Sequence, residues 1–434
     1  MESTLMPQKI KFRDVVNITV IVAALGYFVD VYDLVLFLII GRRSLQDLIP
    51  GIGEGLEKNF DLLLNIQMTG MLIGGILWGV LGDKKGRLSV LFGSILMYSL
   101  ANIANGLMAN VKAEPDTIIF LYGALRLIAG IGLAGELGAG ITLVSEIMSK
   151  ETRGYGTMIV ASVGVLGAVV AGLIGGSETI SWEITYYIGG GLGLTLLLMR
   201  IGVFESGMFE NVKAKEVTKG NFFQLFTNKK RAFKYINCIL IGLPVWYIIG
   251  ILIGKGPLIA KVLGVNGAVV PGNCVMLCYS GLVFGDICSG GLSQFLKSRK
   301  KIFYIFYTLA IVLIAIYLSL HNVSNVVFYS LVFALGFSVG FWAVLVTVGA
   351  EQFGTNMRAT AATTIPNFVR GSLVPVTAMF WYFWELFKPS DYAIVYAAMV
   401  VTAIVMTISF VSLYFLAETF GKDLDYLEGE KIFP

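Results

Sequence analysis

The sequence predicts an all-α membrane protein with twelve transmembrane helices, arranged as two six-helix bundles with both termini in the cytoplasm. Three observations support this fold class: an apolar composition, a series of long apolar runs, and an uneven distribution of Lys and Arg between the loops. Of the 434 residues, 56% are hydrophobic and only 14% are charged, whereas about a quarter of the residues of an average soluble domain are charged. One aqueous core could not bury so much apolar surface, so a lipid bilayer is the expected environment of this chain.

The apolar runs set the expected number of helices. A helix that spans the bilayer needs about 20 mostly apolar residues, and twelve such runs follow one another along the chain. The chain also contains 51 glycines, which let helices pack closely in a membrane. The runs cover residues 15–41, 60–82, 87–108, 118–147, 155–179, 182–204, 234–256, 272–294, 302–320, 324–350, 362–385 and 389–417.

Only one connection between these runs is long, and it divides the chain. We expect an N-terminal six-helix bundle over residues 1–204, a cytoplasmic linker with an interfacial helix over 205–233, and a C-terminal six-helix bundle with a short tail over 234–434. If both termini are cytoplasmic, 23 of the 32 Lys and Arg residues lie in cytoplasmic segments or at the cytoplasmic ends of the runs, and seven lie in outer loops or at the outer ends. Cytoplasmic loops of membrane proteins carry such an excess of Lys and Arg, so the charges predict this orientation and an even number of helices.

The two predicted bundles also carry similar sequence motifs at corresponding positions. Glu146 and Arg153 follow the fourth run, and Glu351 and Arg358 follow the tenth run with the same spacing. The Gly- and Lys-containing loop at 79–87 has a degraded copy at 290–297, again between the second and third runs of its half. Two repeats of this kind are typical of secondary transporters, whose substrate site lies at the repeat interface near the bilayer midplane.

Several motifs carry a resemblance to one family. The pattern G-x-x-x-D-x-x-G-R at 79–87 and the pattern R-x-x-x-G-x-G at 126–132 resemble two signatures of the major facilitator superfamily. The repeated Glu-to-Arg spacing resembles the branch that holds metabolite:proton symporters and sugar porters, as does the segment 200–209, where Gly207 stands in place of the usual Pro. The resemblance covers essentially the whole chain. It implies a secondary transporter, not an enzyme, that works as a monomer and couples substrate movement to protons by alternating access.

The charged residues of the motifs at the cytoplasmic helix ends are the candidates for an inner gate. We expect them to form ion pairs that hold the helix ends together when the inner gate is shut and that break when it opens. The alternative interpretation is that they only set the topology and are solvated, which is what we expect of Lys84, Lys85 and the basic run 297–301. The candidates are Asp83, Arg87, Glu146 and Arg153 for the N-terminal half, and Arg200, Glu205, Glu351 and Arg358 for the C-terminal half.

Charges inside predicted helices indicate function because each costs about 2.5–3.5 kcal/mol on insertion scales. Asp30 and Asp33 lie three residues apart in the first run, so they share one helix face. Two carboxylates this close do not both ionise easily, which suits one of them to carry a proton. The family resemblance likewise places an acidic group here in metabolite:proton symporters. The alternative is that both residues lie near the outer helix end and are solvated.

Three further charges within predicted spans are candidates for the site. Arg126 is the first candidate for binding an anionic group, or for pairing with Asp33 when the site is empty. Glu136 lies ten residues further on, about 15 Å along a helix, so we do not expect it to pair with Arg126; it is a third proton-coupling candidate that faces the pore nearer the cytoplasm. Arg370 offers a second buried cation from the C-terminal half, unless it snorkels to the surface or pairs with Asp286.

Aromatic and polar residues complete the predicted substrate site. The seventh run holds Pro244 followed by Trp246 and Tyr247, and a kinked, glycine-rich helix with aromatic side chains suits a moving gate. The alternative is that these two aromatics only pack. With them, the predicted substrate-binding residues are Arg126, Arg370, Tyr27, Trp246, Tyr247 and Asn367.

Other classes of site are disfavoured by the sequence. The chain has one His and four Cys, and the cysteines lie in apolar runs, so we expect no metal, no disulfide and no cofactor. The pattern G-x-G-x-x-G at 130–135 satisfies a dinucleotide-binding fingerprint, but it lies inside a predicted span rather than after a strand. The glycines at 250 and 254 with Lys255 lack the spacing and the Ser or Thr of a phosphate-binding loop. Without a nucleotide site, the energy for transport is expected to come from an ion gradient.

The combined prediction is a transporter in the bacterial inner membrane. Its partners are the lipid bilayer, protons and a small anionic or zwitterionic metabolite, without nucleic acid. Organic acids rank first as substrates, and proline- or betaine-like zwitterions and carboxylate-rich metal chelators stay open. Two alternatives remain: a proton-antiport exporter of a metabolite or carboxylate siderophore, and a non-transporting membrane receptor. The fifth run has no Pro, which counts against the drug:proton antiporters.

Overall fold

The computed structural model describes residues 17–85, 87–138, 140, 153–205 and 222–421. These residues form helices and contain no β-strand; a single isolated backbone bridge joins Asn266 to Ser324. The expectation of an all-α protein is therefore confirmed. The five predicted gate positions Asp83, Arg87, Glu146, Arg153 and Glu205 lie outside what the structure describes, either as whole residues or in their side chains.

In the part of the N-terminal half that the structure describes, six long helices follow the first six predicted runs. Asn17 caps the first of them by accepting a hydrogen bond from the Val20 N–H at 3.0 Å, and Pro115 begins α5 at a position where a missing N–H costs nothing. The helices are α2 (Ile18–Leu48), α3 (Leu56–Lys85), α4 (Arg87–Leu107), α5 (Pro115–Leu133), α7 (Arg153–Gly175) and α8 (Trp182–Glu205).

The C-terminal half contains more and shorter helices. They are α9 (Lys229–Leu240), α10 (Leu243–Tyr247), a π-helical turn η5 (Ile248–Ile253), α11 (Gly256–Val262), α12 (Pro271–Phe295), α13 (Arg299–Leu318), α14 (Asn325–Ser338), α15 (Trp342–Glu351), α16 (Thr355–Gly371), α17 (Leu373–Phe387) and α18 (Ala393–Phe415). Short 3-10 turns lie at Gly53–Gly55, Met108–Asn110 and Phe222–Phe226. The last of these, η4, stands where we expected an interfacial helix.

Four of the predicted continuous helices are interrupted. The seventh run breaks before Pro244, because proline cannot continue the hydrogen-bond ladder, and then forms the π-helical turn. The tenth run breaks near Gly340, whose backbone packs directly on Gly285 of α12. The eleventh run breaks at Ser372, and the fourth ends at Leu133 before a turn. Breaks of this kind within apolar segments commonly lie beside transport sites.

Ten helical stretches of the described residues are long and apolar enough to cross a membrane. The two predicted runs that fall short are the fifth, whose apolar part covers only Ile159–Gly175, and the eleventh, which is divided between α16 and α17. The protein is therefore an integral membrane protein, while the expected number of twelve spans depends on these two segments.

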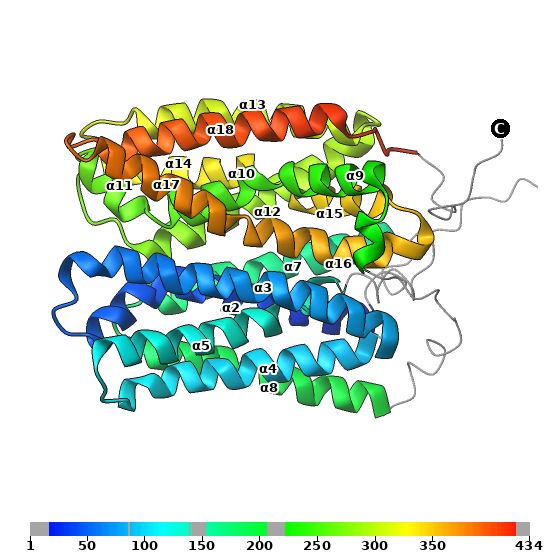
Figure 1. The fold of residues 1–434 in the computed structure, drawn as a ribbon, viewed down its shortest axis with the longest axis horizontal. Helices are drawn as coiled ribbons and strands as arrows, with labels where there is room; N and C mark the ends of the chain where they lie inside the picture. Colours follow the sequence, from blue (N-terminus) through cyan, green and yellow to red (C-terminus); the bar gives the residue numbers. More distant parts are fainter. Residues whose placement is uncertain (1–16, 86, 139, 141–152, 206–221, 422–434) are drawn as a thin grey trace, which may run out of the picture.

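The helices run side by side along the long axis of the molecule (Figure 1). Helices of the N-terminal half, in blue to green, occupy the lower part of that view, and α13, α14, α17 and α18 occupy the upper part. The two halves meet where α7 packs on α12 and where α3 packs on α16 and α17. Glycine permits the first contact: a Cβ on Gly172 of α7 would lie 2.8 Å from the backbone oxygen of Gly272 in α12.

Candidate functional site

A small cavity lies at the centre of the molecule, between the two halves. Its volume is about 20 Å³, which is room for about one water molecule. The residues that line it come from α2, α7, α10, η5, α12, α15 and α16. They are Tyr27, Val31, Leu34, Val165, Val245, Trp246, Ile249, Tyr279, Leu282, Trp342 and Arg370. Three of the six predicted substrate-binding residues, Tyr27, Trp246 and Arg370, therefore lie together at this cavity.

The charged group at the cavity is Arg370, which faces Asp30 of α2. Its Nη2 atom lies 3.8 Å from Asp30 Oδ2, and both side chains are buried. Arg370 also donates a long hydrogen bond of 3.5 Å to Asn367 and lies 5.7 Å from the ring centre of Trp342. Neither oxygen of Asp30, nor Nε of Arg370, has a hydrogen-bond partner among the described residues. Buried polar groups are nearly always paired, so this arrangement keeps hydrogen-bonding capacity beside the cavity for another molecule or a proton.

Asp286 was the alternative partner for Arg370, and the structure gives it a different contact. Its Oδ1 atom accepts a hydrogen bond of 3.0 Å from the Ala343 N–H at the start of α15. A carboxylate in this position satisfies a free N–H at a helix N-terminus and complements the helix dipole. Asp286 thus supports the helix that carries Trp342 into the cavity.

Arg126 lies inside the N-terminal half and does not line the central cavity. Its guanidinium donates to Asn102 and Asn105 of α4, each at 3.1 Å, and to Gln67 of α3 at 3.5 Å. It also lies 4.9 Å from the ring centre of Tyr186. The structure therefore does not bring Arg126 and Arg370 together as two cations facing each other across one site.

Asp33 lies near Arg126 but does not form an ion pair with it. Both residues are fully buried, and Arg126 is close enough to act on the Asp33 carboxylate electrostatically. Neither oxygen of Asp33 has a hydrogen-bond partner among the described residues. Gly189 of α8 packs directly on this carboxylate. Asp33 thus joins the polar interior of the N-terminal half, whereas Asp30 faces the other half.

Glu136 and Arg200, which we expected in separate roles, form one buried ion pair. Arg200 Nη1 donates to Glu136 Oε2 at 3.1 Å, and Nη2 donates to the other oxygen. The pair packs on Gly26 of α2, where any side chain would overlap it. Because α5 ends at Leu133, Glu136 follows a turn and meets α8. Arg200 therefore contacts the N-terminal half, rather than the C-terminal gate to which the sequence motif assigned it.

The other two predicted binding residues have partners away from the cavity. Tyr247 donates to the backbone oxygen of Ala398 at 2.6 Å and lies 2.7 Å from Thr402 Oγ1. Asn367 donates to the backbone oxygen of Ala134 at 2.9 Å, a contact that joins α16 to the end of α5. Tyr247 thus holds η5 to α18, and Asn367 holds the two halves together beside Arg370.

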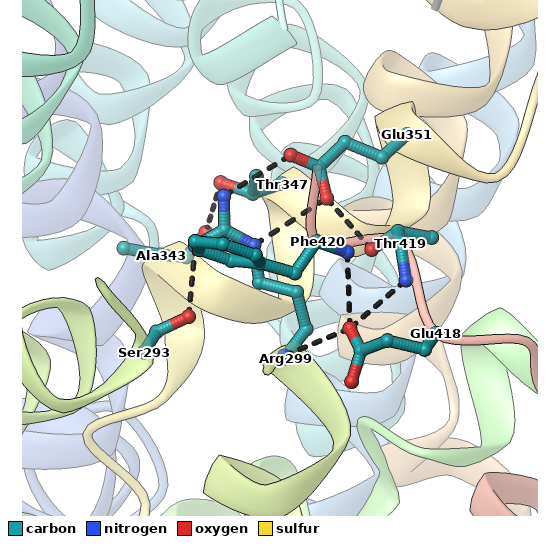
Figure 2. Close-up of polar contacts among 8 residues, drawn as sticks. All are labelled: Ser293, Arg299, Ala343, Thr347, Glu351, Glu418, Thr419 and Phe420. Atoms are coloured by element: carbon teal, nitrogen blue, oxygen red, sulfur yellow. Dashed lines mark hydrogen bonds and ion pairs between the residues drawn. The ribbon is translucent and has the colours of Figure 1, made fainter. Parts of the chain in front are cut away.

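At the inner helix ends, Glu351 pairs with Arg299 rather than with the predicted Arg358. Figure 2 shows Arg299 between Glu351, 3.1 Å away, and Ser293, 2.8 Å away. Thr419 adds a hydrogen bond of 2.7 Å to Glu351. These contacts tie α12, α13 and α15 to the segment that follows α18. The sequence missed Arg299 because it lies in a run of basic residues that we attributed to topology alone.

Glu418 belongs to the same cluster and holds the start of α13. Its oxygens accept a hydrogen bond of 2.9 Å from the backbone N–H of Arg299 (Figure 2). They also accept hydrogen bonds from the backbone N–H of Lys300 at 3.2 Å and from the Ser298 hydroxyl. Partial burial raises the pKa of Glu418, but these hydrogen bonds, led by the one from Ser298, outweigh burial and lower the pKa to about 2. The carboxylate is therefore ionised at any physiological pH.

Comparison with known proteins identifies the family. The sequence profile described as Major Facilitator Superfamily matches residues 34–374. The chain belongs to the major facilitator superfamily. It is therefore a membrane transporter and not an enzyme, as the sequence motifs implied.

Relatives within the superfamily differ in how much of the chain they match. A Haemophilus influenzae protein, whose name describes it as a metabolite transport protein, is 28% identical over 375 residues, which are 82% of this chain and 86% of that protein. Inorganic phosphate transporter 1-2 of Oryza sativa is 30% identical over 161 residues, only 35% of this chain and 30% of that protein. Low affinity inorganic phosphate transporter 4 of Lotus japonicus is 28% identical over 175 residues, or 39% and 32% of the two chains.

Solved structures match the fold over nearly the whole chain. The proton:xylose symporter XylE bound to 6-bromo-6-deoxy-D-glucose gives a TM-score of 0.68 at 15% identity, covering 94% of this chain and 97% of that one. The inward open conformation of XylE from E. coli gives 0.67 at 14% identity, covering 93% and 97%. At such low identity the match shows the superfamily fold alone.

Proposed function

We propose that this transporter moves a small anionic or zwitterionic metabolite across the bacterial inner membrane by proton-coupled symport with alternating access. The observation that carries the proposal is the contact between Arg370 and Asp30 beside the central cavity, with unused hydrogen-bonding capacity on both side chains. The contact joins the two halves, so a change in it acts on the surfaces that alternating access must separate. The chain works as a monomer in this proposal.

The contact suggests how a proton and an anion become coupled. While Asp30 is ionised, it attracts the guanidinium of Arg370. When Asp30 takes up a proton, this attraction is lost, and Arg370 is free to bind a carboxylate or phosphate with two parallel hydrogen bonds. An empty, deprotonated carrier and a loaded, protonated carrier are then the two favoured states, which is the requirement for symport.

The remaining predicted residues take supporting roles in this mechanism. Tyr27 and Trp246 line the cavity and would contact the apolar part of the substrate.

Asp33 is the second candidate for the proton, because its carboxylate is buried and has no hydrogen-bond partner. Glu136 is the weakest of the three proton-coupling candidates, because Arg200 already neutralises the charge of its carboxylate. Asn367 orients Arg370, and Arg126 shapes the interior of the N-terminal half.

We keep the inner gate as part of the proposal, with two changes: Arg299 is the partner of Glu351, and Arg200 leaves the gate because it pairs with Glu136. Glu351 works with Arg299 in the C-terminal half, and Arg358 lies at the start of α16. The corresponding gate of the N-terminal half is Asp83, Arg87, Glu146 and Arg153, and Glu205 at the end of α8 serves the C-terminal half with Glu351 and Arg358. We also keep the division of the chain at residues 204 and 234.

The substrate class follows from the single guanidinium at the cavity and from the names of the relatives. Organic acids rank first, because a guanidinium binds a carboxylate in a planar, two-point geometry. Inorganic phosphate joins the candidates, since phosphate transporters match part of this chain and a guanidinium binds phosphate in the same way. Zwitterions and carboxylate-rich chelators rank after organic acids and phosphate as substrates.

Uptake into proteoliposomes with an imposed pH gradient tests the proposal. The panel consists of small organic acids, inorganic phosphate, proline, betaine and a tricarboxylate chelator. We expect one class to accumulate only when the outside is acidic, and the wild-type signal to disappear when a protonophore collapses the gradient. Uptake that ignores the gradient would refute symport. Release driven by outside acid would support the antiport exporter, and binding without any flux would support a receptor.

A further inference from the structure

A second charged cluster joins the two halves at the outer end of the molecule. Lys255 lies in the turn between η5 and α11 and is fully buried. Its Nζ atom lies 2.7 Å from Asp61 Oδ2 and 3.5 Å from Glu57 Oε2, both on α3. Glu57 and Asp61 lie near the start of α3, which the loop charges place on the outer side. A lysine from the C-terminal half is thus held by two carboxylates of the N-terminal half.

Each carboxylate has a second partner, so the cluster is electrically balanced. Arg42 of α2 donates two hydrogen bonds to Glu57, at 2.6 and 2.8 Å. Trp381 of α17 donates its indole N–H to Asp61 at 2.6 Å. Two cations therefore face two anions, and every contact of Asp61 in the cluster comes from the C-terminal half.

Aromatic rings exclude water from the lysine. Its Nζ atom lies 5.3 Å from the ring centre of Trp381 and 5.7 Å from that of Trp384, and the two indoles stack at 4.6 Å. An ammonium in such surroundings is attracted by the ring faces and depends strongly on its carboxylate partners. An outer hollow of about 800 Å³, lined in part by Asp61 and Trp381, lies against the cluster between α3 and α17.

We propose that Arg42, Glu57, Asp61 and Lys255 form an ionic latch that closes the outer side of the substrate path. The latch crosses the same interface between the halves as the central cavity, at its outer end. Opening to the outside separates α3 from α17 and pulls Lys255 away from Asp61, and the outer hollow gives water a route to hydrate the released charges. The proposal rests on alternating access, but it depends on neither the substrate nor the proton.

The rate at which a cysteine at the central cavity is labelled measures how readily the outer side opens, which is what the latch is proposed to control. Val31 lines the cavity and is 2% exposed, so in a Val31→Cys chain a membrane-impermeant maleimide applied from outside reacts only when the outer side opens. Cys288 is the one exposed cysteine of the described residues and is replaced by Ser throughout. The chain without Val31→Cys gives the background rate, and no substrate is needed.

Loss of either latch partner is expected to raise the labelling rate at least about tenfold, a shift of about 1.4 kcal/mol in the opening equilibrium. The variants are Lys255→Met and Asp61→Asn, and the charge exchange Lys255→Asp with Asp61→Lys is expected to restore a slow rate. Lys261→Met is the matched control, since it removes an exposed lysine from α11, six residues after Lys255 at the same end of the molecule. The labelling rate of this control is expected to equal that of the Val31→Cys chain whose latch residues are unchanged.

Milder variants keep the proposal testable if a buried charge change prevents folding. Trp381→Phe keeps an aromatic ring but removes the indole N–H that Asp61 accepts, and it is expected to raise the rate by a smaller factor. Unchanged labelling in Lys255→Met, Asp61→Asn and Trp381→Phe, with folded protein, would overturn the latch. So would an equal increase in the labelling rate of Lys261→Met. Because these rates are independent of flux, they can fail or succeed separately from symport.

Discussion

Arg370 of α16 approaches Asp30 of α2 to 3.8 Å, from Nη2 to Oδ2, beside the central cavity. The distance is too long for a hydrogen bond, and both groups are fully buried. A contact of this kind holds the halves together electrostatically but leaves both side chains able to take another partner.

Replacing Asp30 by Asn is expected to abolish accumulation driven by a pH gradient while leaving substrate exchange nearly intact. The amide cannot take up and release a proton, yet it keeps the shape of the protonated carboxyl and leaves Arg370 available. Gradient-driven uptake and counterflow of labelled substrate are measured in the same proteoliposomes. Asp116→Asn, at an exposed position of α5, is the control. Wild-type accumulation in Asp30→Asn would remove this residue from coupling and direct attention to Asp33.

Replacing Arg370 by Lys is expected to weaken substrate binding about tenfold, or about 1.4 kcal/mol. Lysine keeps the charge but cannot form two parallel hydrogen bonds to an anionic group. The KM for uptake should therefore rise more than the maximal rate falls. Arg43→Lys makes the same exchange at a guanidinium that binds the Ser177 and Ile180 carbonyls at the outer end, and its KM should not change. Equal effects of the two variants would contradict a binding role for Arg370.

The Glu136–Arg200 pair is expected to act mainly on stability. Glu136→Gln leaves the buried Arg200 without a counter-charge, which costs about 3–5 kcal/mol for buried pairs. Removing both charges, as Glu136→Gln with Arg200→Met, should recover part of the loss. Thermal unfolding of the detergent-solubilised protein gives the comparison. If Glu136→Gln unfolds like wild type but loses gradient-driven uptake, Glu136 carries a proton after all.

Glu418 is expected to stabilise the inner end of the C-terminal half in a pH-dependent way. Its pKa is about 2 in the folded protein, below the ordinary glutamate value of about 4.3. A lowered pKa adds stability that is fully present above the ordinary value and is lost as the pH falls towards the lower one. The difference in melting temperature between wild type and Glu418→Gln should therefore be constant from pH 6 to 8, on the order of a few degrees, and shrink below about pH 4. A difference that is independent of pH would mean that Glu418 acts by packing alone.

Several residues of the site could be identified from the sequence because they are charged residues within apolar, membrane-spanning runs. A charge within an apolar run is costly, and this criterion selected Asp30 and Arg370, which the structure brings together. The same criterion selected Arg126, but it could not tell that three amides of α3 and α4 surround this guanidinium. Lys255 was considered only as part of a phosphate-loop pattern, although a lysine ending an apolar helix was a sign that it needed a buried partner.

By itself, the sequence determined that this is an all-helical membrane transporter of the major facilitator superfamily. Span length, composition and loop charge are local properties that a bilayer imposes on each segment separately, so they can be read along the chain. The tertiary structure alone decided the partners: Arg200 for Glu136, Arg299 for Glu351 and Asp61 for Lys255. Which faces of two helices meet depends on their rotation and packing against neighbours, and the helices of these pairs are distant in sequence. The breaks after Leu133 and near Pro244 and Gly340 lie ahead of Glu136, Lys255 and Glu351 along the chain. The periodicity of the apolar runs therefore does not reveal which way these three side chains point.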